Sequence, residues 1–335
     1  MKKIIALLLV LMLTLCLVSC SKKEDSSKKK LRIGISHITM YDEWCKGVYD
    51  EFLRQGEEFG YEIDIQSAEG DPELQAKQIE NFVAMKYDMI LVDPVSSDGI
   101  VTSLKVAGDN NIPVIAFDAN TSYDKLITHV AWDHADTGVQ SAKYVADYAK
   151  KNLGGKVKVG MITGLSSEHV KCRSDAFMET LEKELGKENV EYVFNQDNSS
   201  IGSVESAANI VTNNISKYCD FIWGAVDNYA MGARVALESN NIEGTKVISA
   251  GAWGTDPFTK LYTGDNWYYM CIGVSPEEIV RLTLQSVKDY FDGKDIPREQ
   301  NIDLAIIDST NIQHYVDLFM DPEEVKKLKK GPNVK

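Results

Sequence analysis

The sequence lacks the short motifs that mark nucleotide-binding proteins and common hydrolases. It has no G-x-G-x-x-G turn and no G-x-x-x-x-G-K-[ST] loop, which argues against a dinucleotide or a nucleoside triphosphate as ligand. It also has no G-x-S-x-G elbow and no H-E-x-x-H pair. Distant residues can converge on a hydrolase site, so the hydrolase alternative stays open. We nevertheless expect a protein that is not an enzyme and needs no cofactor.

Cysteine and histidine are scarce, with six and five residues. No C-x-x-C pair occurs, and the histidines form no metal-like spacing with the cysteines, so we expect no metal. Four cysteines lie in the part that we expect to fold: Cys45, Cys172, Cys219 and Cys271. Isolated buried thiols are the default interpretation, and the spacing assigns no disulfide.

Positive charge is in deficit, with 36 Lys and Arg against 50 Asp and Glu. The formal net charge of −14 argues against nucleic acid and other polyanions as partners. The composition is 44% hydrophobic over 335 residues, which allows a large core and indicates two domains rather than one.

The N-terminus is typical of a bacterial lipoprotein signal. Lys2 and Lys3 precede an apolar run at 4–18, which is too short to span a membrane, and Leu17-Val18-Ser19-Cys20 has the order of a lipobox. We expect residues 1–19 to be a signal peptide, Cys20 to carry lipid, and residues 20–30 to form a polar linker. The predicted location is extracytoplasmic and membrane-anchored, periplasmic or on the outer face. An uncleaved anchor with a buried Cys20 is the alternative.

From residue 31 onward, short β-rich runs alternate with longer helical patterns. Met89-Ile90-Leu91-Val92 is continuously apolar, as in parallel sheets covered by helices on both faces. The pattern predicts an α/β fold of two doubly wound, Rossmann-like lobes with a ligand cleft between them. The expected strands are 31–36, 62–67, 87–93, 112–118, 156–163, 190–195, 220–226, 246–251, 268–274 and 302–308.

Six segments, in order, carry a resemblance over residues 31 to about 315. They are IGIS at 33–36, IPVIAFD at 112–118, HVAWD at 129–133, Arg173 ahead of Ala176-Phe177, DNYAMGA at 227–233 and IIDSTNI at 306–312. Each is short and partly structural, but together they resemble the bacterial sugar-binding proteins of the ribose- and galactose-binding type, which serve ATP-driven importers.

This resemblance implies a type I periplasmic binding protein, with two discontinuous lobes joined by a three-crossing hinge. The expected N-terminal lobe comprises 31–131 plus 275–304, and the C-terminal lobe 133–273 plus 306–335. The expected partners are a sugar-like small molecule and an ABC permease, and the protein is expected to be a monomer. A membrane sensor kinase is the alternative partner. Cytoplasmic repressors share these lobes but begin with a helix-turn-helix, where this chain has the signal-like segment.

Asp118 and Arg173 are the first candidate ligand contacts. Asp118 ends an apolar strand, where a carboxylate can accept bonds from adjacent hydroxyls, and the resemblance implies that role. Its alternative role is a turn or helix cap. Arg173 offers a rigid fork of donors, and the resemblance places it facing the cleft. Its alternative is an exposed arginine paired with a nearby acid.

Four weaker candidates complete the predicted site. Trp44 and Tyr41 follow the first strand, where the resemblance implies aromatics against a sugar ring, although Trp44 also fits a helix core. Asp227 precedes a helix and fits a cap as well as a ligand contact. Trp253 stands where the family has an aspartate.

Other family positions differ as well. Val226 replaces an asparagine, Val274 a polar residue and Asn198 an aromatic residue. A pocket with fewer hydroxyl-binding groups should prefer a ligand with fewer polar groups or another ring placement than ribose, because unpaired hydroxyls cost binding. Polyols, furanosyl signals and nucleosides therefore stay open as ligand classes.

Overall fold

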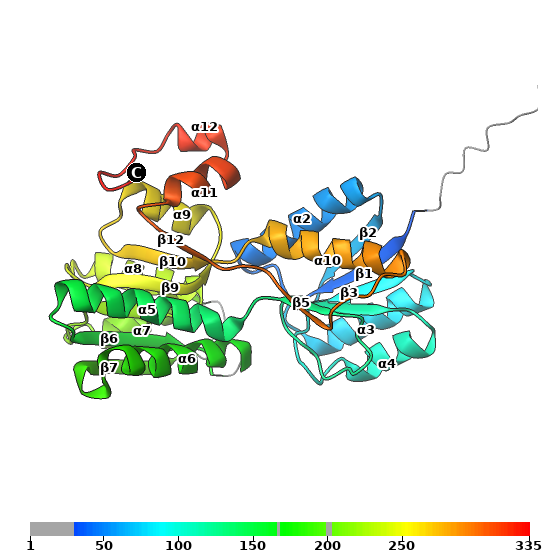
Figure 1. The fold of residues 1–335 in the computed structure, drawn as a ribbon, viewed down its shortest axis with the longest axis horizontal. Helices are drawn as coiled ribbons and strands as arrows, with labels where there is room; N and C mark the ends of the chain where they lie inside the picture. Colours follow the sequence, from blue (N-terminus) through cyan, green and yellow to red (C-terminus); the bar gives the residue numbers. More distant parts are fainter. Residues whose placement is uncertain (1–29, 166–167, 199–202) are drawn as a thin grey trace, which may run out of the picture.

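A computed structural model describes residues 30–165, 168–198 and 203–335 and contains two parallel-sheet α/β lobes (Figure 1). The first lobe has a six-stranded sheet in the order β11-β5-β4-β3-β1-β2. All its neighbouring strands are parallel. Its strands are β1 (Arg32–His37), β2 (Glu62–Ser67), β3 (Met89–Val92), β4 (Val114–Phe117), β5 (His129–Ala131) and β11 (Glu299–Asn301).

The second lobe repeats the arrangement, with the strand order β12-β10-β9-β8-β6-β7. Only β12 runs antiparallel to its neighbour, β10. The strands are β6 (Val157–Thr163), β7 (Val190–Asp197), β8 (Phe221–Gly224), β9 (Lys246–Ala252), β10 (Tyr268–Gly273) and β12 (Ala305–Asp308).

Helices cover both faces of the first sheet, with α2 and α10 on one side and α3 and α4 on the other (Figure 1). Strand β3 shows the cause, because Met89 and Leu91 enter the core under α2 and α10 while Ile90 and Val92 enter the opposite core. The helices of this lobe are α2 (Glu43–Phe59), α3 (Pro72–Ala84), α4 (Val101–Asp109) and α10 (Pro276–Phe291).

The second lobe carries the remaining helices around a single large core. They are α5 (His134–Asn152), α6 (Glu168–Leu185), α7 (Val204–Asn213), α8 (Asp227–Ser239), α9 (Thr255–Thr263), α11 (Ile312–Phe319) and α12 (Pro322–Val325), with a 3₁₀ turn at Lys187–Asn189. Helices α9 and α11 lie together near the C-terminus (Figure 1).

The chain passes between the sheets three times: from β5 to α5, from β10 to α10, and from β11 to β12. The predicted fold class, two doubly wound lobes with a three-crossing hinge, is confirmed. Cys20 and its lipobox lie outside the described residues. Within those residues, no helix is both long and apolar enough to cross a bilayer.

Candidate ligand-binding site

Asp118 lies one residue past β4, at the carboxyl edge of the first sheet. Its backbone N–H donates to the Val130 carbonyl at 2.9 Å, and its own carbonyl accepts from His129 Nε2 at 2.9 Å. These bonds hold the residue at φ 56°, a left-handed conformation that aspartate tolerates better than most residues. The side chain is buried, and this burial, followed by the charge of Asp93, raises the pKa of Asp118 well above its usual value.

Arg173 approaches from α6 of the second lobe. The side chain is 5% exposed, and its Nη1 donates to the Ala225 carbonyl at 3.2 Å. A Cβ on Gly251 would lie 2.7 Å from Nη1, so the missing side chain at Gly251 leaves room for the guanidinium. Burial lowers the pKa of Arg173, and Asp118 is the largest opposing influence. The two predicted anchors therefore interact electrostatically between the lobes.

His134, the first residue of α5, connects these two anchors. Its Nδ1 lies 3.0 Å from Arg173 Nη2, and its Nε2 lies 3.6 Å from Asp118 Oδ1. A guanidinium only donates, so Nδ1 must accept and Nε2 carries the hydrogen in the neutral ring. Burial, reinforced by the charge of Arg173, lowers the pKa of His134 well below its usual value. The site therefore presents a neutral N–H donor beside an oxygen of the Asp118 carboxyl group.

Several buried polar atoms here have no hydrogen-bond partner within the described protein. They are Asp118 Oδ1, Trp132 Nε1, His134 Nε2 and Arg173 Nε. The Trp132 ring lies 4.6 Å from the His134 ring and 5.8 Å from Arg173 Cζ, so these groups are neighbours. Each unpaired buried group costs about 1–3 kcal/mol, and such groups gathered in one place indicate a polar ligand.

A second buried pair lies beside Asp118 at the same sheet edge. His37 Nδ1 lies 3.0 Å from Asp93 Oδ2, and both side chains are fully buried. His37 Nε2 faces the Cys45 carbonyl at 3.0 Å and must donate to it, so the contact with Asp93 requires another proton between the two side chains. Burial raises the pKa of Asp93, in keeping with a shared proton.

A second histidine, His169, lies beside His134. The His169 ring lies 5.1 Å from the His134 ring, and burial with the Arg173 charge lowers the pKa of His169 to about 4. The described residues contain no group of three or more His, Cys, Asp or Glu side chains placed to hold a metal ion.

Trp44 and Tyr41, the two aromatic residues predicted after the first strand, lie in different environments. Trp44 contacts Trp132 edge to face, with 5.4 Å between ring centroids, and its Nε1 donates to the Val274 carbonyl at 3.0 Å. Trp44 therefore joins the Asp118 and Arg173 group through Trp132. Tyr41 is 69% exposed, and its hydroxyl donates to the Glu69 carbonyl at 3.2 Å. Among the residues that the structure describes, no hydrogen bond or ring contact joins Tyr41 to that group.

Trp253 packs into an aromatic cluster of the second lobe. Its ring contacts Phe319 at 4.5 Å, Phe258 at 5.2 Å and Tyr315 at 6.2 Å between centroids. Two of these partners lie on α11, so the cluster ties α11 to the body of the lobe. This packing accounts for the indole without a ligand, and its contact with ligand stays a prediction.

Asp227 is the first residue of α8, and Tyr268 donates to its Oδ1 at 2.5 Å. Burial is the largest influence on this carboxyl and raises its pKa to about 7, which the Tyr268 bond opposes and Glu43, Asp256 and Asp42 reinforce. A buried carboxyl with a raised pKa at the start of a helix is suited to hydrogen bonding with a polar ligand. The contact of Asp227 with ligand also stays a prediction.

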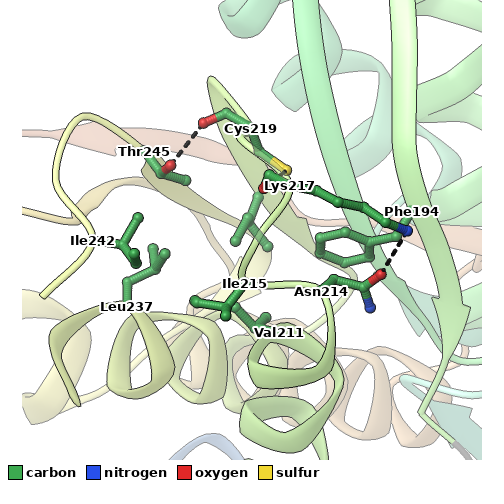
Figure 2. A pocket seen from close by; sticks show the side chains of 10 residues that line it. Phe194, Val211, Asn214, Ile215, Lys217, Cys219, Leu237, Ile242 and Thr245 are labelled. Carbon is green, nitrogen blue, oxygen red and sulfur yellow. Dashed lines mark hydrogen bonds between the residues drawn. The ribbon is translucent and has the colours of Figure 1, made fainter. Parts of the chain in front are cut away.

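A small pocket lies elsewhere in the second lobe, among Phe194, Val211, Cys219 and Leu237 (Figure 2). Its polar groups bond one another: Lys217 Nζ donates to Asn214 Oδ1 at 3.1 Å, and Thr245 Oγ1 to the Cys219 carbonyl at 2.7 Å. The mostly apolar lining lacks the paired donors and acceptors of the Asp118 region, so we do not place the ligand there.

Comparisons with known proteins agree with this architecture. The ribose import binding protein of Haemophilus influenzae is 22% identical over 312 residues, covering 92% of this chain and 99% of its own. The arabinose-transporter binding protein of Shewanella sp. ANA-3, solved with L-arabinofuranose, has a TM-score of 0.78 at 17% identity, covering 88% of this chain and 98% of its own.

A fructose-binding periplasmic domain of a hybrid two-component system has a TM-score of 0.75 at 21% identity, covering 89% of this chain and 97% of its own. The family described as periplasmic binding protein domain matches residues 33–295. That match spans most of the sequence, and the chain belongs to this periplasmic binding protein family.

Proposed function

We propose that this protein is an extracytoplasmic solute-binding protein that captures a monosaccharide or related small polar ligand between its lobes for an ABC importer. The observation that supports this most directly is the meeting of Asp118 from one lobe with Arg173 and His134 from the other, at unpaired buried atoms. The similarity to a ribose import binding protein over nearly the whole length points to the same class of ligand.

The arrangement suits a hydroxyl group. A ligand hydroxyl can donate to Asp118 Oδ1 while it accepts from His134 Nε2, because the two atoms lie 3.6 Å apart. Arg173 Nε supplies another donor, and the Trp44 and Trp132 rings supply apolar faces for the C–H side of a sugar ring. We propose binding without catalysis.

A ligand screen by thermal shift tests this function. We expect at least one uncharged compound among aldopentoses, aldohexoses, ketohexoses, polyols and nucleosides to raise the melting temperature, because a ligand at 100 times its dissociation constant adds about 2.7 kcal/mol. A matching change in solution scattering would show lobe closure. If no compound of these classes shifts the melting curve, the proposed ligand class is wrong.

A sensory role is the second candidate, favoured by the structural match to the periplasmic domain of a hybrid two-component system. Both roles use the same cleft and differ in the membrane partner. Reconstitution with the membrane proteins encoded by neighbouring genes separates the two roles. In the first role the liganded protein should stimulate ATP hydrolysis by a permease complex, and in the second it should alter the activity of a kinase.

We also propose that Cys20 carries lipid and anchors a monomer to the membrane surface, based on the lipobox order Leu17-Val18-Ser19-Cys20. Changing Cys20 to Ala should release the protein from the membrane fraction or leave an uncleaved precursor. Mass spectrometry of the N-terminal peptide should find diacylglycerol on wild-type Cys20 and none on the variant. An unmodified wild-type N-terminus would contradict the anchor.

A further inference from the structure

Helix α9 of the second lobe begins without a capping side chain of its own. Its N-cap is Gly254, and no side chain of α9 or Gly254 bonds the first amides of the helix. A carboxylate from the other lobe occupies that place instead: Glu43 Oε2 accepts from the Asp256 N–H at 3.4 Å. Glu43 is the first residue of α2, 213 positions earlier in the chain.

Gly254 provides the space for this carboxylate. A Cβ built on Gly254 would lie 2.0 Å from Glu43 Oε2 and 2.9 Å from Glu43 Cβ, so any side chain at 254 would displace Glu43. Gly254 also has φ 148°, a backbone conformation that other residues rarely adopt. Because Glu43 and Gly254 belong to different lobes, this close packing depends on how the two lobes lie against each other.

The charges around the contact act in opposite directions. The amide groups at the N-terminus of α9 attract the Glu43 carboxylate, as at any helix N-terminus. Asp227, Asp256 and Asp42 lie close enough that Glu43, Asp256 and Asp42 all raise the pKa of Asp227. Closure thus gathers carboxylates from both lobes, and the helix amides offset part of their repulsion.

We propose that Glu43 is a positioning residue that holds the lobes closed by capping α9 across the cleft, without touching the ligand. The proposal rests on the proposed function only in assuming that the lobes open and close. Glu43 lies next to Trp44, whose Nε1 bonds the Val274 carbonyl at the crossing into α10, so the contact acts close to the hinge. It stabilises the closed arrangement and slows release of whatever the cleft holds.

Hydrogen–deuterium exchange of the ligand-free full chain tests this role. We expect Glu43→Ala to speed exchange roughly two- to fivefold in peptides covering the start of α9 and also in those following β4 in the other lobe, as the cleft opens more often. Glu43→Gln keeps an acceptor and should fall between Ala and wild type. Glu57→Ala removes the same charge from an exposed position of the same helix and should leave exchange unchanged.

The peptides in which Glu43→Ala speeds exchange decide between the possible interpretations. Faster exchange at α9 alone would show a local cap with no influence on closure, and unchanged exchange at both places would show no cap at all; either result overturns the proposal. No ligand is used, so a wrong ligand class would leave this result intact. With any compound that raises the melting temperature, Glu43→Ala should further speed dissociation relative to Glu57→Ala.

Discussion

Asp118→Asn and Arg173→Ala should each weaken ligand binding by about 2–4 kcal/mol, roughly 30- to 1,000-fold in dissociation constant. Asp118→Asn keeps the side-chain shape but removes the charge that strengthens a hydroxyl bond, and it replaces one acceptor oxygen by a donor facing His134 Nε2. Arg173→Ala removes the Nε donor and frees the His134 tautomer, because Nδ1 loses its Nη2 partner.

Calorimetric titration with a compound found in the screen measures both changes. Asp124→Asn and Arg54→Ala are matched controls, since both residues are exposed and lie outside the site. The double variant of Asp118 and Arg173 should lose less than the sum of the single losses, because the first change already weakens the closed state. Wild-type affinity in either single variant, with an intact fold, would contradict the assignment of these anchors.

The strand pattern could be predicted where strands are apolar and helices separate them. Met89-Ile90-Leu91-Val92 lies in β3, and its alternate side chains enter two different cores, as the parallel-sheet interpretation requires. Two strands were missed for physical reasons. β5 has three residues, too few for a periodic signal, and β11 is Glu-Gln-Asn, a polar strand that forms because its backbone pairs with β5.

The expected strand at 302–308 is shorter, because β12 begins at Ala305. Residues 302–304 instead carry the chain from β11 in one sheet to β12 in the other. The Ile302 N–H still donates to the Ala131 carbonyl of β5 at 2.8 Å, while Asp303 is exposed, so apolar content alone did not separate the crossing from the strand. Ile302, at 9% exposed, illustrates this ambiguity.

The structure brings together Asp118 and Arg173, which the family resemblance singled out, and adds residues that only folding brings to them. Asp118 was proposed mainly from the family resemblance, with support from the rule that ligands bind past the carboxyl ends of parallel strands. His134 was not among the predicted site residues, although it directly follows Asp133, the last residue of a segment that carried the family resemblance. Its role depends on Arg173, 39 positions away, and its position next to Asp133 was the signal that could have found it.

The same reason applies to two other features. His37 follows the expected strand 31–36 and Asp93 ends the expected strand 87–93, but only the register of β1 and β3 places them face to face. Trp253 stands in a family ligand position, yet its aromatic partners Tyr315 and Phe319 come from a helix some 60 positions later. Sequence position predicted the loop that carries Trp253 but could not show which way the ring would pack.

Asp227→Asn should raise the free energy of unfolding by up to about 4 kcal/mol at pH 8 and by only about 1.5 kcal/mol at pH 5. The pKa of Asp227 is about 7 in the folded protein, mainly through burial, against about 3.9 in an unfolded chain. The folded state therefore binds a proton that the unfolded state lacks between these values. Wild-type stability therefore falls as pH rises from about 4 to about 7 and levels off above 7, where the folded carboxyl also ionises, against Glu43, Asp256 and Asp42.

Asparagine does not titrate and still offers an oxygen to the Tyr268 hydroxyl, which now bonds Asp227 at 2.5 Å, so the variant should escape this loss. Chemical denaturation at pH 5, 6, 7 and 8 measures the difference between variant and wild type, which removes the titration of other groups common to both. Asp124→Asn, at an exposed carboxyl, should give no pH-dependent difference.

If the free energies of unfolding of Asp227→Asn and wild type change in parallel with pH, Asp227 ionises as readily as an exposed acid. If Asp227→Asn gains stability at pH 8 while its ligand affinity falls, the Asp227 carboxylate lowers the stability of the protein but contributes to ligand binding. That is the expected conflict between stability and function. Gained stability at unchanged affinity would instead leave Asp227 as the start of α8 and remove it from the ligand site.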